Sequence, residues 1–121
     1  SYKELELSLR LRKKDWITAL ENQKAVYLIT DKQNGKLYVG SATSNYGMLL
    51  QRWQSYVDNG HGGNKELRIL VEKQGLNYVK ENFQYSVLEN YNGKIDDKFV
   101  LKRESWWKEV LKSREHGYNA N

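Results

Sequence analysis

An Asn34-Gly35 pair between two apolar runs constrains this 121-residue chain more than any other feature of its sequence. Such a pair predicts a β-hairpin, because a type I′ turn needs positive φ at both central residues. The hairpin is expected over residues 25–42. With the pair as its two-residue turn, Gly40 lies opposite Ile29.

The two faces of this hairpin are predicted to differ in chemistry. Because side chains alternate along a strand, Tyr27 and Tyr38 share a face with Lys36 and Gly40. We expect the Tyr27 hydroxyl to point into a wet cleft, where Gly40 leaves a gap between the phenols. The other face carries the apolar residues Val26, Leu28, Leu37 and Val39.

The N-terminal segment is predicted to be an arm or linker over residues 1–23. Leucines alternate with charged and polar residues over 4–12, which is the period of a half-buried edge strand, although leucine, glutamate and arginine individually prefer helix. Asp15 is the expected N-cap of a short helix over residues 15–22.

The rest of the chain alternates predicted helices with a third strand. Apolar spacing predicts helices at residues 48–59, 65–74 and 98–114, and Asn64 and Gly75 are the expected N-cap and stop of the second. Alternation over 82–89 predicts a strand that joins the hairpin. The expected fold class is therefore α/β (α+β), with a small, mainly antiparallel three-stranded sheet flanked by helices.

The last predicted helix has a wide apolar arc, with Glu104 at its margin. The arc is made of Phe99, Val100, Arg103, Trp106, Trp107, Val110 and Leu111.

Composition narrows the function classes. There is no cysteine, which excludes disulfides and thiolate metal sites and leaves oxygen and nitrogen ligands for any metal. No apolar run approaches about 18 residues, so no membrane span or membrane partner is expected, and a cytoplasmic location is compatible. The net charge of +5 favours an anionic partner, while a solvated basic surface is the other interpretation.

The hairpin also carries a resemblance to a known family. Val26-Tyr27, followed after ten residues by Tyr38-Val39-Gly40, resembles the paired motif of the GIY-YIG nuclease family. The resemblance spans residues 24–121, which are expected to be the nuclease domain. One position departs from the pattern, because the glycine that opens the family's first motif is Ala25 here. The family's key positions are matched in order by Tyr27, Tyr38, Gly40, Arg52, His61, Glu104 and Asn119.

This resemblance implies a metal-dependent endonuclease that hydrolyses phosphodiester bonds in DNA. Glu104, in a late helix and followed by tryptophans, would be the one metal-binding carboxylate, holding Mg²⁺ or Mn²⁺. Arg52 would neutralise charge on the phosphate oxygens. Gly40 would be a substrate-binding position, because the scissile phosphate would approach the space that it leaves between the phenols. Asn119 would fix local structure or a water molecule.

Two residues compete for the role of general base. Tyr27, with Tyr38 tuning it, is one candidate, but a phenol with a pKa near about 10 needs cationic neighbours to act as a base at neutral pH. Lys36 is expected to be such a neighbour and to bind phosphate. His61 is the competing base or the proton relay to the leaving group, and is otherwise an ordinary turn histidine. The backbone at Gly62 to Asn64 is equally compatible with a phosphate-binding nest.

Three other functions are compatible with the same residues. A catalytically inactive nucleic-acid-binding module would keep the basic surface without a metal, an RNase would need the same groups, and an interaction domain would bind no nucleic acid. An upstream domain of a longer chain could supply specificity.

Overall fold

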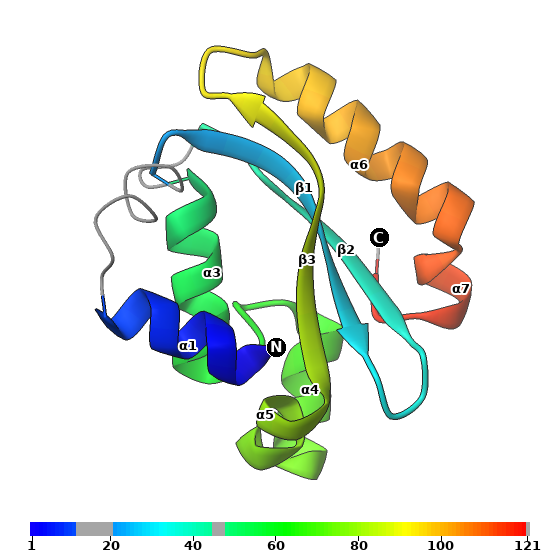
Figure 1. The fold of residues 1–121 in the computed structure, drawn as a ribbon. Coiled ribbons are helices and arrows are strands. Elements are labelled where there is room, and N and C mark those ends of the chain that lie inside the picture. The colour runs from blue at the N-terminus through cyan, green and yellow to red at the C-terminus, as the bar shows by residue number, and fades with distance from the viewer. Residues whose placement is uncertain (12–20, 45–47, 121) are drawn as a thin grey trace.

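The computed structural model describes residues 1–11, 21–44 and 48–120, and within them the chain is an α/β domain built on a three-stranded antiparallel sheet (Figure 1). The strands pair in the order β2-β1-β3, which leaves β2 at one edge. The predicted fold class is confirmed, and the third strand extends three residues beyond its predicted end. The strands are β1 (Gln23–Asp31), β2 (Leu37–Ala42) and β3 (Phe83–Asn92).

Helices cover both faces of the sheet (Figure 1). The face that carries Tyr27 and Ile29 is buried against α1, α3 and α5, while α6 packs on the opposite face against Val26 and Val39. The site described below therefore lies on a sheet that is fixed from both sides. The described helices are α1 (Tyr2–Leu11), α3 (Met48–Asn59), α4 (Lys65–Gln74), α5 (Leu76–Asn82), α6 (Asp97–Leu111) and α7 (Ser113–His116).

The edge strand predicted over residues 4–12 is wrong, because α1 occupies most of that segment. Tyr2, Leu5 and Leu9 are buried at helical spacing, whereas Leu7 is 47% exposed. A strand would have placed the leucines together on one side. The segment follows the helix-forming preferences of leucine, glutamate and arginine, because packing against α3 and β3 stabilises a helix with its apolar side chains on one face. The short helix predicted over 15–22 falls mainly on residues outside the described ranges.

The central helices agree closely with the sequence pattern. The bounds of α3 and α4 match the prediction, and the Asn64 side chain accepts a hydrogen bond from the Leu67 backbone N–H at 3.2 Å, as an N-cap does. Helix α5 was not predicted, since its seven residues are too few to show a clear period. The last helix was predicted to continue to residue 114, but α6 stops at Leu111, because Lys112 adopts a left-handed conformation with φ 54°.

The hairpin register differs from the predicted one. Tyr27 pairs with Gly40, and Ile29 pairs with Tyr38, so the connection is longer than two residues. Of the central pair only Gly35 has positive φ, and the Asp31 carboxylate instead accepts a hydrogen bond from the Gln33 N–H at 3.0 Å. The predicted pairs are therefore wrong. The predicted faces are right, because a shift of two residues returns every side chain to the same face.

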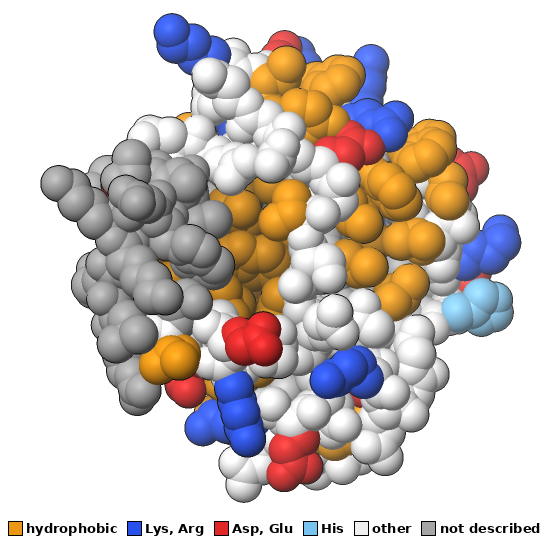
Figure 2. Space-filling model, in the orientation of Figure 1, with side chains coloured by type: hydrophobic (Ala, Val, Ile, Leu, Met, Phe, Trp, Pro, Cys, Tyr) orange, Lys and Arg blue, Asp and Glu red, His pale blue; other side chains and the backbone are white. Residues whose placement is uncertain are grey.

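Only part of the apolar arc predicted for α6 is buried. Val100 is inaccessible, but Phe99, Trp106 and Val110 are 43%, 45% and 51% exposed. Figure 2 shows hydrophobic side chains at the surface on the side where Figure 1 places α6. A narrow three-stranded sheet covers only one side of the helix, which explains the exposed remainder. None of the described helices has the length and apolar character needed to cross a membrane.

Candidate active site

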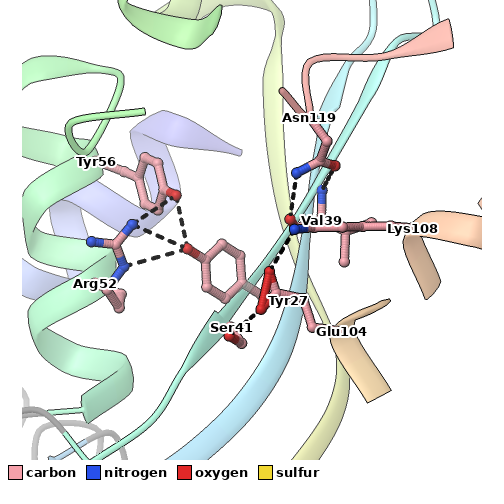
Figure 3. Close-up of polar contacts among 8 residues, drawn as sticks. All are labelled: Tyr27, Val39, Ser41, Arg52, Tyr56, Glu104, Lys108 and Asn119. Carbon is pink, nitrogen blue, oxygen red and sulfur yellow. Dashed lines mark hydrogen bonds and ion pairs between the residues drawn. The ribbon is translucent and has the colours of Figure 1, made fainter. Parts of the chain in front are cut away.

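A cluster of two phenols and one guanidinium lies where α3 packs on the hairpin (Figure 3). The hydroxyls of Tyr27 and Tyr56 are 2.8 Å apart. Arg52 donates from Nη2 to Tyr56 at 3.1 Å and from Nε and Nη2 to Tyr27 at 3.4 Å. Arg52 and Tyr56 are one turn apart on α3, so the helix presents both to the same strand. The guanidinium is thereby held in one orientation by two hydroxyls.

Tyr27 is fully buried, so the expectation that its hydroxyl points into a wet cleft is wrong. Burial raises the pKa of Tyr27 to about 12, the neighbouring Tyr38 adds to the rise, and Arg52 opposes it. Tyr27 is therefore a neutral phenol at neutral pH. The cation with the main influence on its pKa is Arg52, not Lys36 as expected.

The space beside Gly40 is filled by the ring of Tyr27. A Cβ built on Gly40 would lie 2.5 Å from the Cζ and hydroxyl oxygen of Tyr27, closer than such atoms approach in proteins. The gap that was expected to admit substrate beside Gly40 is therefore occupied by the Tyr27 phenol. Gly40 is needed because a side chain at this position would collide with the Tyr27 ring.

The pKa of Tyr38 is influenced by both charged groups of the site. Tyr38 is 8% exposed, and its ring centroid is 6.4 Å from that of Tyr56. Burial raises the pKa of its phenol, Arg52 acts to lower it, and the Glu104 carboxylate adds to the rise. Both charges are therefore close enough to Tyr38 to affect its ionisation.

Glu104 approaches β2 from the opposite face of the sheet (Figure 3). Its Oε1 accepts a hydrogen bond from Ser41 Oγ at 2.5 Å, and its Oε2 lies 3.0 Å from Lys108 Nζ. The Glu104 side chain is 14% exposed. The site therefore straddles the edge strand, with Arg52 and the phenols on one side and Glu104 on the other.

The oxygen donors around Glu104 fit a hard divalent cation. Glu104 supplies one carboxylate and Ser41 one hydroxyl, and the described residues contain no cluster of three acidic or histidine side chains. Mg²⁺ commonly binds through one or two carboxylates and keeps several waters, with substrate phosphate completing its coordination. Lys108 already places a positive charge against the same carboxylate.

Asn119 fastens the outer edge of β2. Its Oδ1 accepts from the Val39 N–H at 2.8 Å and its Nδ2 donates to the Val39 carbonyl at 2.9 Å, so its amide pairs with β2 as a neighbouring strand would. The side chain is buried, as expected of an asparagine that fixes local structure.

His61 lies in the turn between α3 and α4, which also packs on the phenol cluster. A Cβ on Gly62 would meet the Tyr56 ring at 2.8 Å, and Asn64 helps to lower the pKa of Tyr38. His61 Nδ1 accepts a hydrogen bond from the Gly63 N–H at 2.8 Å. In the neutral imidazole the proton is then on Nε2, which makes Nε2 a donor.

The proposed phosphate-binding nest is not formed in this turn. The N–H of Gly62 donates to Asn59 Oδ1 at 2.8 Å, the N–H of Gly63 donates to His61 Nδ1 at 2.8 Å, and the N–H of Asn64 donates to the His61 carbonyl at 2.9 Å. All three donors are therefore occupied within the turn.

Lys36 and Ala25 lie at opposite ends of the hairpin. Lys36 is exposed beside the turn, with Nζ 5.6 Å from the centroid of the Tyr118 ring, and it is not among the main influences on the pKa of either hairpin phenol. Ala25 is fully buried and pairs with Ala42, so the alanine at the family's glycine position is accommodated by a small partner.

Sequence reasoning missed three residues of the site: Tyr56, Ser41 and Lys108. Tyr56 and Lys108 each lie four residues after a candidate site residue, Arg52 and Glu104, and this spacing was the available signal. Ser41 had none, because its contact with Glu104 depends on how α6 packs against β2.

Comparisons with known proteins agree with this fold. The GIY-YIG catalytic domain profile matches residues 23–119. A structure of the catalytic domain of homing endonuclease I-TevI is 26% identical, covering 81% of this chain and 98% of that chain with a TM-score of 0.62. A substituted form of the catalytic domain of intron endonuclease I-TevI is also 26% identical, covering 82% and 94% with a TM-score of 0.61. No curated protein sequence matches this chain.

The profile match covers well over half of the chain and includes every candidate site residue. The matched structures share its three-stranded sheet and flanking helices. With the arginine, the phenols and the glutamate gathered around one edge strand, the chain belongs to the GIY-YIG family of nuclease catalytic domains.

Proposed function

We propose that this domain is a divalent-metal-dependent endonuclease that hydrolyses phosphodiester bonds in DNA. The observation that carries the proposal is the placement of Arg52 and Glu104 on either side of β2. The similarity to homing endonuclease catalytic domains and the net charge of +5 support DNA as the substrate.

Arg52 is assigned to the nonbridging phosphate oxygens, where negative charge increases in the transition state. Tyr27 and Tyr56 engage its Nε and Nη2, and no hydrogen bond to a described residue involves Nη1. A guanidinium already fixed in position loses little freedom when phosphate binds. Tyr27 and Tyr56 are positioning residues in this scheme.

Tyr38 is assigned to orient the attacking water. It is the more accessible of the two hairpin phenols, and it is affected by both Arg52 and Glu104. Tyr27 is less suited to this role, because it is inaccessible and its pKa is raised to about 12.

His61 is assigned to the leaving group. With Nδ1 engaged by Gly63, its Nε2 can donate a proton or a hydrogen bond to the departing oxygen. This assignment favours the proton relay over the general base among the two roles considered for His61.

Glu104 and Ser41 would hold the divalent cation. When bound, Mg²⁺ or Mn²⁺ would supply positive charge to the phosphate and lower the pKa of a coordinated water. Glu104, held by Ser41, contributes the fixed negative charge that such a site needs.

The test is cleavage of supercoiled plasmid with Mg²⁺, with Mn²⁺ and with a chelator. We expect nicked and linear products that the chelator abolishes. Arg52→Lys keeps the charge but cannot make the fork of hydrogen bonds, so it should cut more slowly by about tenfold or more.

The alternative of an inactive binding module predicts a different pattern. DNA would then shift in a salt-dependent gel assay, but neither metal would produce cleavage. Activity on RNA alone would instead identify an RNase.

A further inference from the structure

Lys108 is a buried lysine one helical turn beyond Glu104. It is 7% exposed in all, and its Nζ lies 3.0 Å from Glu104 Oε2. Lysine is rarely buried unless its charge is paired, so this ammonium is held in place by the carboxylate together with its surroundings. The same geometry puts a cation beside the expected metal ligand.

Both oxygens of Glu104 are engaged in this arrangement. Ser41 donates to Oε1 at 2.5 Å, and the Lys108 ammonium lies against Oε2. A divalent cation that binds the carboxylate would therefore meet a like charge in contact with its ligand. Two cations cannot share one partly buried carboxylate without repulsion, which is strong where water is scarce.

We propose that Lys108 is a built-in competitor of the divalent cation at Glu104, and that metal binds this carboxylate only by displacing the ammonium. The inference rests on the proposed function, because it takes Glu104 as the metal ligand. Lysine suits the role, since its flexible stem lets the ammonium move away while the helix stays in place. The site consequently has a lower intrinsic affinity for metal than its oxygen donors alone would give.

The test measures Mn²⁺ binding to the DNA-free protein from the electron paramagnetic resonance signal of free Mn²⁺. Lys108→Met keeps the length of the side chain and removes the charge. We expect it to bind Mn²⁺ about tenfold or more tightly than the parent protein, a difference of about 1.4 kcal/mol. Lys102→Met is the matched control, because Lys102 is an exposed lysine on the same helix and the charge change is equal.

A second substitution keeps the test decisive if the methionine variant is poorly folded. Lys108→Gln retains hydrogen-bond donors toward Glu104 without the charge, so it should show the same gain in Mn²⁺ affinity. Circular dichroism and thermal melting establish that each variant is folded before titration.

The outcomes separate this inference from the proposed function. Equal Mn²⁺ affinity in the parent and in both Lys108 variants would overturn the competition, and so would an equal gain in Lys102→Met. Adding Glu104→Gln to the Lys108→Met protein should abolish the tight binding. Should tight binding survive that change, Glu104 is not the ligand, and both the inference and the metal assignment fail.

Discussion

Removing the Tyr27 hydroxyl tests the buried phenol cluster directly. Tyr27→Phe deletes the hydrogen bond to Tyr56 at 2.8 Å and two long contacts from Arg52 at 3.4 Å. An ordinary buried hydrogen bond contributes about 1 kcal/mol, and one to a charged group contributes about 1.5–3 kcal/mol when well formed. The Arg52 contacts are at the limit of hydrogen-bond length, so they add little.

The partners left behind by Tyr27→Phe are not orphaned. Tyr56 still accepts from Arg52 Nη2 at 3.1 Å, which limits the penalty for unpaired buried groups. We therefore expect a loss of about 1–2 kcal/mol in the free energy of unfolding. For a chain of this size that corresponds to a fall in Tm of about 4–8 °C.

A matched control is available in Tyr85. Its hydroxyl is buried and has no hydrogen-bond partner among the described residues. Tyr85→Phe should therefore change stability by less than about 0.5 kcal/mol, or increase it. Urea unfolding of both variants at neutral pH gives the comparison.

Cleavage provides the second measurement for Tyr27→Phe. Arg52 loses one of the two hydroxyls that orient it, so plasmid cutting should slow by about tenfold or more, whereas Tyr85→Phe should cut normally. If Tyr27→Phe is no less stable than Tyr85→Phe, the hydroxyl cluster does not exist as described.

Four further changes test the rest of the site. Glu104→Gln should leave a folded protein that no longer cuts plasmid, and a parental rate would refute the metal assignment. Gly40→Ala places a methyl group 2.5 Å from the Tyr27 phenol, so unfolding should become easier by about 1–3 kcal/mol, as overpacking does. Asn119→Ala leaves the Val39 N–H and carbonyl without their partner and should lower the free energy of unfolding in urea by about 2 kcal/mol. An unchanged unfolding midpoint would show that the Asn119 amide does not stabilise β2. The Arg103 hydrogen bonds hold the pKa of Glu89 at about 2, so the stability that Glu89 contributes is present above its ordinary pKa and is lost as pH falls toward about 2; acid titration of Glu89→Gln should show a smaller loss.

The local spacing of apolar residues was enough to predict much of this fold from the sequence alone. The bounds of α3 and α4 followed from helical apolar spacing and from the Asn64 cap, because such signals act within a few residues. The faces of the hairpin also followed, since alternation survives a two-residue error in register. The order of the key residues along the chain indicated the family, as the profile match confirms.

Tertiary packing decided the features that local patterns leave open. Residues 4–11 carry both a strand period and helix-forming residues, and burial of Leu5 and Leu9 against neighbouring elements selected the helix. The hairpin turn depends on contacts that the Asn-Gly pair alone does not predict: the Asp31 carboxylate accepts from the Gln33 N–H, and the Asn34 amide donates to the hydroxyl of Tyr118, which is distant in the sequence.

The chemistry of the site depended on tertiary structure most of all. Sequence placed Tyr27 and Arg52 in neighbouring elements, but only the packing of α3 on β1 buries the phenol and raises its pKa. Likewise, Glu104 was recognised from sequence, whereas its contacts with Ser41 and Lys108 required α6 to pack against β2. A pattern of residue types predicts which face a side chain occupies, but burial and charge depend on what the rest of the chain places against that face.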